Sequence, residues 1–241
     1  MRIFALRLFE QKQMNRNLSK ININRYYYIS ALILIPIRCD KMLYFTSKNS
    51  SFPLGDKKMP FVYLNISEDY ERMTEKHFAA YMYMYKNHYN DFDWYIKADE
   101  DTYVIVENLR WFLADKCPNE KFIYGKVLKQ LYYRDWYNVG NLDRGFLQGG
   151  SGFVINRETI KLFSEAYIKN SSFCTMIKGR YGDQEISNCF RKLGIYPGES
   201  RDKMGRERFH MDRMDLLWLE PSDFIKAFSK NPTKNVNLIF I

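Results

Sequence analysis

Short apolar runs and amphipathic helical patterns alternate along this chain, and this alternation is the strongest constraint on its fold. The apolar runs have the composition of buried strands and span 42–46, 61–64, 94–98 and, interrupted by glycines, 146–155. The helical patterns carry apolar residues three and four positions apart and span 70–88, 106–113, 160–167 and 183–193. Alternating strands and helices are typical of an α/β fold with a mostly parallel sheet flanked by helices. The length of 241 residues fits a single domain of this class.

Composition excludes some classes of protein. The 46% hydrophobic and 17% aromatic content is too high for a disordered chain, which lacks the apolar area to offset the entropy of ordering. The net charge of +9 is spread along the chain, so it indicates either a mildly basic surface or attraction to an anionic ligand such as a nucleotide. There is neither a nucleic-acid recognition motif nor a clustered basic stripe, so we expect no nucleic-acid partner.

Cysteines and apolar stretches bear on the cellular setting. None of the four cysteines forms a CxxC pair, which leaves structural disulfides or buried thiols. The longest apolar stretch, 26–37, is shorter than the roughly 18 residues needed to cross a bilayer, and charges interrupt the first residues where a signal peptide would lie. The sequence as written therefore predicts no membrane anchor.

An acidic turn follows the apolar run 94–98. Asp99, Glu100 and Asp101 are consecutive carboxylates, which repel one another unless a cation or many donors offset their charge. Ligands in α/β folds gather at the carboxyl ends of strands, and Mg²⁺ or Mn²⁺ bridging a diphosphate would suit such a cluster. Most acidic triplets, however, are solvated turns. The residues alone leave both interpretations open.

Glycine and aromatic residues supply further candidates. Gly149, Gly150 and Gly152 would let the backbone approach a sugar or adopt a positive φ, or would simply form a bulge or tight turn. Trp136 and Tyr137, in a polar loop, are candidates to stack on the face of an acceptor sugar.

Other aromatic and histidine residues are expected to pack. Trp94, Tyr103 and Trp111 are predicted to lie in the core rather than to form an acceptor platform. His77 and His88 lie on or beside the apolar stripe of the helix 70–88, where a partly buried packing role is more usual than metal ligation.

Four segments together carry a resemblance to a known family. Residues 93–111, which include the acidic turn, resemble the DxD region of the fringe-like family-31 glycosyltransferases, and within them the core 1 β1,3-galactosyltransferases. The other three agree in order and spacing: 38–41 with the family's RCxK element, 149–154 with its GGxG turn, and 194–210 with its GDSRD…GKExFH stretch. Such a series is far more specific than one motif. The resemblance covers roughly residues 38–210.

The resemblance implies a GT-A-like (Rossmann-like) fold and an inverting, metal-dependent transfer. The donor would be a UDP-sugar, UDP-galactose in the core 1 enzymes, and the acceptor a GalNAc-bearing glycoprotein. Asp101 and His210 would ligate Mn²⁺, with Mg²⁺ as the alternative, because a neutral imidazole suits Mn²⁺ better. Asp99 would contact both the metal and the sugar nucleotide. Glu100, Gly149 and Gly150 would line the nucleotide-sugar site.

The resemblance also assigns a base and a disulfide. The family's ED pair matches Gly182-Asp183, so Asp183 would be the general base that takes the acceptor's proton. Cys174 and Cys189 match a family disulfide that would pin the helix carrying this base. The usual partner of Cys39 lies on a strand that this chain is expected to lack.

Domain limits and setting follow from the same resemblance. We expect a catalytic domain over 38–220, a C-terminal tail over 221–241, and a segment 1–37 that matches none of the family's N-terminal elements, its first strand included. A Golgi lumenal or Golgi membrane (type II) setting is implied by the family, whose members carry a membrane anchor, and a homodimer is compatible with it. The alternative function is that of a catalytically inactive paralogue acting as a folding partner or sugar-binding module.

Overall fold

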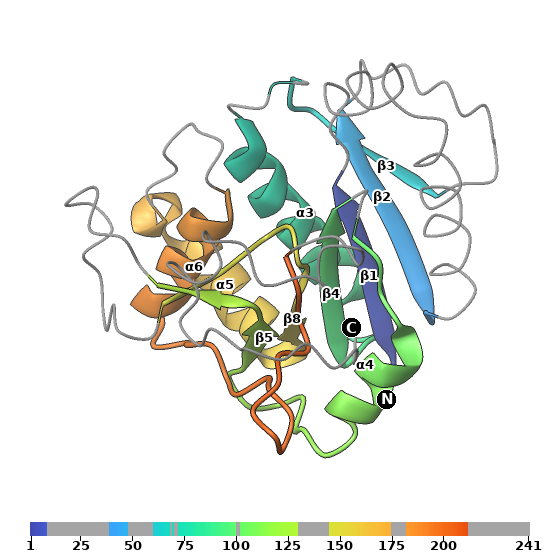
Figure 1. Cartoon of the computed structure of the whole chain (residues 1–241). Coiled ribbons are helices and arrows are strands. Elements are labelled where there is room, and N and C mark those ends of the chain that lie inside the picture. The colour runs from blue at the N-terminus through green and yellow to red at the C-terminus, as the bar shows by residue number, and fades with distance from the viewer. Residues whose placement is uncertain are drawn as a thin grey trace, which may run out of the picture.

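A six-stranded sheet with helices on both faces forms the body of the molecule (Figure 1). The computed structural model describes residues 1–8, 39–47, 60–67, 69, 72–99, 102–129, 145–174 and 182–211. Its strands are β1 (Ile3–Leu8), β2 (Lys41–Ser47), β3 (Phe61–Leu64), β4 (Trp94–Asp99), β5 (Ile123–Gly125), β6 (Val127–Leu128), β7 (Phe146–Leu147) and β8 (Phe153–Asn156). Its helices are α3 (Met73–His88), α4 (Val106–Leu113), α5 (Arg157–Lys169), the 3₁₀ turn η4 (Ser171–Phe173) and α6 (Gly182–Lys192).

The sheet is mixed, with its parallel part at one side. Its strand order is β3-β2-β1-β4-β8-β5, and β1 to β4 run parallel while β8 is antiparallel to both β4 and β5. A short antiparallel pair, β6 with β7, lies apart from it. The predicted α/β class, with a single domain and a mostly parallel sheet, is confirmed.

Strand β1 lies in the segment that we expected to stand outside the fold. It pairs in parallel with β2 on one side and β4 on the other, and Ala5 faces both Met42 and Ile96. The expectation of a missing first strand is therefore wrong for residues 3–8. The run is only six residues long and contains Arg7, so its pattern is not that of a buried apolar strand.

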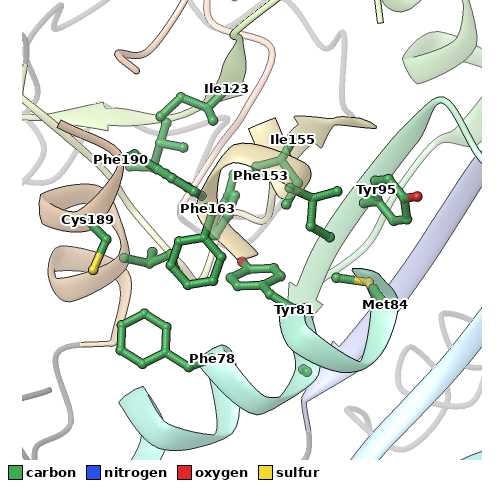
Figure 2. Close-up of a cluster of buried hydrophobic side chains, with 14 of the residues drawn as sticks. Phe78, Tyr81, Met84, Tyr95, Ile123, Phe153, Ile155, Phe163, Cys189 and Phe190 are labelled. Carbon is green, nitrogen blue, oxygen red and sulfur yellow. The ribbon is translucent and has the colours of Figure 1, made fainter. Parts of the chain in front are cut away.

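Two cores form because side chains of successive strand residues point to opposite faces. On one face, Met42, Tyr44, Trp94 and Ile96 pack against α4. On the other, Leu43, Phe45, Tyr95, Phe153 and Ile155 pack against α3, α5 and α6. Figure 2 shows the second core, in which Phe163 of α5 lies between Tyr81 of α3 and Phe190 of α6. This core fixes α3 and α6 over the same face of β4.

Two of the aromatic residues predicted for the core lie at the surface. Trp94 is 1% exposed, as expected, but Tyr103 is 40% and Trp111 is 66% exposed. Trp111 lies on the outer side of α4, away from the stripe formed by Leu109 and Phe112, and the Arg208 guanidinium lies 4.9 Å from its ring centre. The helical pattern was correct for α4, but Trp111 falls outside its buried face.

No helix within the described residues has the length and apolar character to span a membrane.

Candidate functional site

The carboxyl end of β4 places a buried lysine beside an aspartate. Lys97 and Asp99 alternate with Ala98, so both point to the face covered by α3 and α6. The Lys97 Nζ donates to Asp99 Oδ1 at 2.5 Å and to the Gly149 carbonyl at 3.0 Å. The lysine is only 3% exposed, so these bonds compensate a charge that burial would otherwise make costly.

Thr102 ties the turn after β4 to the glycine turn. Its backbone N–H donates to the Asp99 carbonyl, its hydroxyl oxygen accepts from the Asp99 N–H at 2.9 Å, and its hydroxyl donates to the Gly150 carbonyl at 3.0 Å. Glu100 and Asp101 lie outside the described residues, so the predicted metal ligand Asp101 stays a prediction. Hydrogen bonds of Thr102 thus connect the residues on both sides of the acidic turn to each other and to the glycine turn.

The glycines occupy a turn between β7 and β8, where the sequence had suggested one interrupted strand. The Gly152 N–H donates to the Gly149 carbonyl, and Gly152 has a φ of +71°, a conformation that favours glycine. A Cβ on Gly149 would lie 3.2 Å from both the Lys97 Nζ and the Asp183 Cβ. Gly149 therefore lets the backbone approach two charged side chains, whereas Gly150 is exposed.

Asp183, the predicted base, lies in the first turn of α6 and bonds directly to this turn. Its Oδ2 accepts from the Gly149 N–H at 3.0 Å, and its Oδ1 accepts from the Gln184 N–H at 2.8 Å. Burial raises the pKa of the carboxyl above its ordinary value, and the Asp99 charge adds to the rise; the Gly149 and Gln184 hydrogen bonds and the Lys97 charge oppose it. The predicted residues Asp99, Gly149, Gly150 and Asp183 thus form one connected cluster with Lys97 and Thr102.

His210 lies in the C-terminal part of the described chain. Burial and the nearby Lys126 ammonium lower its pKa to about 4, although a backbone hydrogen bond to Glu207 opposes the shift. The imidazole is therefore neutral near pH 7 and retains a lone pair, as a metal ligand must. Lys126 itself pairs with Glu207 at 3.0 Å, and both side chains are buried.

The described donors fit a divalent ion only in part. His210 has the right protonation state, but Asp99 is engaged by Lys97, and no group of three histidine, cysteine or acidic side chains with metal-site geometry occurs among the described residues. A metal centre would thus depend on Asp101, whose placement is not described.

Four residues in or next to the cluster were not predicted from the sequence as site residues. Lys97 and Thr102 carry hydrogen bonds that join the strand end to the glycine turn. His77 and Tyr81 of α3 are buried, His77 within reach of the Lys97 charge and Tyr81 within reach of the Asp99 charge. A lysine inside an otherwise apolar strand was the available signal for Lys97. No local pattern distinguishes the other three from ordinary packing residues.

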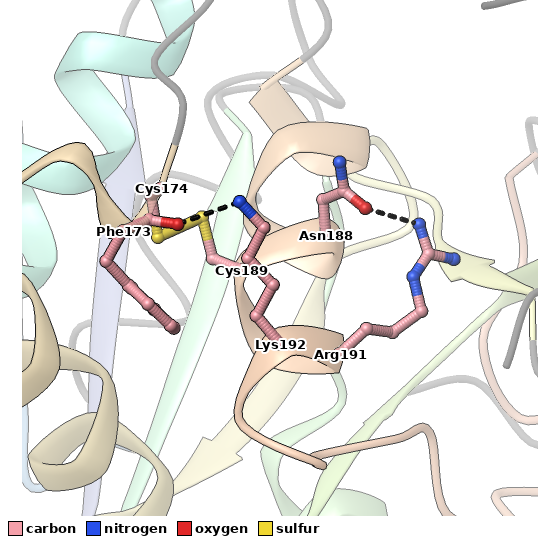
Figure 3. Close-up of a disulfide and its surroundings, with 6 residues drawn as sticks. All are labelled: Phe173, Cys174, Asn188, Cys189, Arg191 and Lys192. Atoms are coloured by element: carbon pink, nitrogen blue, oxygen red, sulfur yellow. Dashed lines mark hydrogen bonds between the residues drawn. A yellow bond between two sulfur atoms is a disulfide. The ribbon is translucent and has the colours of Figure 1, made fainter. Parts of the chain in front are cut away.

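The predicted disulfide is confirmed. Cys174 and Cys189 are bonded, with their Cα atoms 5.3 Å apart, and link the end of η4 to the middle of α6 (Figure 3). Lys192, one turn further along α6, donates to the Phe173 carbonyl at 2.9 Å beside this bond. The helix that carries Asp183 is therefore attached covalently to the segment before it. The proposed acceptor residues Trp136 and Tyr137 lie outside the described residues.

Comparison with known proteins finds relatives whose names describe a galactosyltransferase and a chondroitin sulfate synthase. Over 157 residues the chain is 31% identical to glycoprotein-N-acetylgalactosamine 3-beta-galactosyltransferase 1 of Xenopus laevis, covering 65% of this chain and 40% of that protein. It is 20% identical over 147 residues to human chondroitin sulfate synthase 3, covering 56% of this chain and 15% of that protein. The chain thus spans less than half the length of these relatives.

Solved structures and a family model complete the comparison. A crystal structure of the galactosyltransferase LgtC with donor and acceptor sugar analogs aligns over 98% of this chain and 84% of that one, with a TM-score of 0.49 and 13% identity. An active-site mutant of LgtC gives a TM-score of 0.47 at 12% identity, over 98% of this chain and 85% of that one. The model described as Fringe-like matches residues 60–238. Since this match covers well over half of the chain and includes β4, the glycine turn and Asp183, the protein belongs to the Fringe-like family.

Proposed function

We propose that this protein is an inverting glycosyltransferase that transfers galactose from UDP-galactose, in β1,3 linkage, to GalNAc on O-glycosylated proteins. Family membership and the relative named as a glycoprotein-N-acetylgalactosamine 3-beta-galactosyltransferase support this choice. The observation that carries it is the hydrogen bond from the Gly149 N–H to Asp183, a carboxylate of raised pKa. The carbonyl of the same glycine accepts from Lys97, which links the carboxylate to Asp99 at the end of β4.

Asp183 supplies the general base of the reaction. Its carboxylate takes the proton of the acceptor hydroxyl while that oxygen forms a bond to the anomeric carbon and the bond from that carbon to the UDP oxygen breaks. Attack from the face opposite UDP inverts the configuration. A carboxyl with an ordinary pKa is a weak base, so the raised pKa of Asp183 favours this role.

Lys97 holds the two halves of the site together. Its ammonium binds Asp99 and the Gly149 carbonyl, while the N–H of the same glycine binds Asp183. The strand end, the glycine turn and the base are thereby fixed relative to one another before any ligand arrives. Such preorganisation is what a transfer between two sugars requires, because small misplacements of the base are costly in rate.

Asp101 and His210 are the proposed ligands of a Mn²⁺ ion, with Asp99 close to the metal and the sugar nucleotide and Glu100 and Gly150 near the donor. A metal held there would neutralise charge on the diphosphate as UDP leaves. Mg²⁺ is the alternative ion. The neutral state of His210 supports its assignment, since a protonated imidazole could not ligate.

Calorimetric titration of UDP tests this assignment. We expect UDP binding to the wild-type protein to depend on Mn²⁺ and to be lost in Asp101→Ala, together with transfer of galactose to a GalNAc glycopeptide. Asp115→Ala, which removes an exposed carboxylate on the α4 side, is the matched control and should bind normally. Wild-type turnover in Asp101→Ala would refute the metal assignment. Absence of any Mn²⁺-dependent UDP binding in the wild type would favour a folding partner or sugar-binding module instead.

The remaining features of the proposal concern the setting. Trp136 and Tyr137 would stack on the acceptor sugar. The chain would act in the Golgi lumen or at the Golgi membrane, as part of a protein with a membrane anchor that can form a homodimer. The Cys174–Cys189 disulfide supports an oxidising compartment.

A further inference from the structure

A buried histidine lies against the first residue of the helix that carries Asp183. His77, in the second turn of α3, is 4% exposed, and neither ring nitrogen has a hydrogen-bond partner in the described part of the chain. A Cβ on Gly182 would lie only 2.2 Å from the His77 Nδ1 and 2.7 Å from its Cε1. The ring therefore fills the space that any side chain at position 182 would need.

This contact bears on the active carboxylate because Gly182 and Asp183 are adjacent. On the other side of Asp183, the Gly149 N–H donates to its carboxylate, and a Cβ on Gly149 would lie 3.2 Å from the Asp183 Cβ. Two tight contacts therefore surround Asp183: the His77 ring packs against Gly182, and Gly149 packs against Asp183 itself. We therefore expect a shift at either glycine to move the Asp183 carboxylate.

The surroundings of His77 favour a neutral ring. Burial lowers its pKa well below the ordinary value, and the ammonium groups of Lys97 and Lys76 lower it further. A neutral ring can pack closely beside Lys97 without competing for the Asp99 and Asp183 carboxylates. Burying both ring nitrogens without a hydrogen-bond partner costs stability. We therefore attribute the presence of His77 here to the shape of its ring, which packs against Gly182.

We propose that His77 is a positioning residue that fixes the start of α6, and with it Asp183, by occupying the space beside Gly182. This inference rests on the proposed function of Asp183 as the base. Its structural part, the coupling between His77 and the Asp183 carboxylate, does not depend on that function.

A double-mutant cycle tests the packing. Gly182→Ala should lower the unfolding temperature, because its Cβ meets the His77 ring. In the His77→Ala background the same substitution should cost nothing or stabilise the protein, since the ring is gone and alanine favours a helix. Equal losses in both backgrounds would overturn the proposed contact.

The position of Asp183 is read separately, from the amide resonance of Gly149 in protein labelled with ¹⁵N-glycine. This resonance, assigned by its loss in Gly149→Ala, reports the hydrogen bond to the Asp183 carboxylate. We expect the chemical shift of the Gly149 amide to change in His77→Ala and to stay unchanged in Met84→Ala. The Met84 substitution is the matched control, because it also removes a buried side chain, two turns further along α3. A Gly149 amide that does not move in His77→Ala would refute the positioning role.

Kinetics complete the test. In galactose transfer, His77→Ala should lower kcat at least tenfold with little change in the KM for UDP-galactose, whereas Met84→Ala should retain kcat at a temperature where both variants are folded. Retained kcat in His77→Ala would count against positioning. A wild-type protein without transferase activity would instead refute the proposed function, while the unfolding and amide measurements would still decide the role of His77.

Discussion

Lys97 is the residue on which the candidate site depends most. Its ammonium is buried, and its charge acts on Asp99, through a 2.5 Å contact, and on Asp183, whose pKa it lowers. Burial and the charge of Asp99 act in the opposite direction and prevail, so Asp183 keeps a raised pKa. One lysine thus limits a shift that would otherwise leave the base protonated over a wider pH range.

The pH dependence of galactose transfer should reflect the raised pKa of Asp183. Asp183 must be charged to accept a proton, so kcat is expected to fall as the pH decreases through its raised pKa, at a higher pH than for an ordinary aspartate near 3.8. Asp183→Asn should lower kcat by about 10²- to 10⁴-fold and abolish this acid limb. Asp115→Asn, at an exposed position, should leave rate and profile unchanged. An identical acid limb in Asp183→Asn would assign it to another group.

At the scale of elements, periodicity predicted what was regular and missed what depends on contacts between segments. The strands β2, β3 and β4 and the helices α3 to α6 have clear patterns, because each buries one face or lies wholly in the core. The glycine turn was singled out by composition. Its contacts with Lys97 and Asp183, which lie 52 and 34 residues away, could not be inferred from any local pattern.

Two neighbouring glycines in this turn should differ sharply when replaced. In Gly149→Ala the new Cβ would crowd the Lys97 Nζ and the Asp183 Cβ, so we expect at least a tenfold loss of kcat and about 1–3 kcal/mol of stability. In Gly150→Ala the nearest atoms belong to the Gln148 side-chain amide, which can move aside. Thermal unfolding of both variants, with transfer kinetics for Gly149→Ala, would check this, and similar losses of stability in the two would contradict the packing described for Gly149.

At the scale of the whole molecule, the arrangement of strands was the least predictable feature. Composition and alternation predicted the α/β class, yet residues 3–8 were assigned to a segment outside the domain. In the structure they form β1, between β2 and β4. Pairing on both sides explains how a short strand that contains a charged residue can be central, since its stability comes from neighbours distant in sequence.

Proline in β1 should be far more damaging than its position near the chain end suggests. Because β1 pairs on both sides, each of its backbone N–H groups faces a neighbouring strand, and Ala5→Pro removes one of them from the middle of the sheet. We expect a loss of about 3 kcal/mol or more, measured by urea denaturation. Ala5→Ser keeps the N–H, so it should cost much less stability than Ala5→Pro. A small effect of Ala5→Pro would argue against a central place for β1.

The strand order also dictates when this protein can fold. Ile3 pairs with Trp94, so a ribosome must synthesise roughly the first hundred residues before β1 gains its second neighbour. Closing so long a loop costs conformational entropy, and contacts between residues close in sequence do not offset that cost. Topologies with many such long-range pairings fold slowly. Until β4 has been synthesised, the edge of β1 that pairs with β4, and the aromatic faces of β2, stay exposed to other chains. A newly made chain therefore passes through an aggregation-prone stage, and its yield in cells should depend on chaperones that protect its first ninety or so residues.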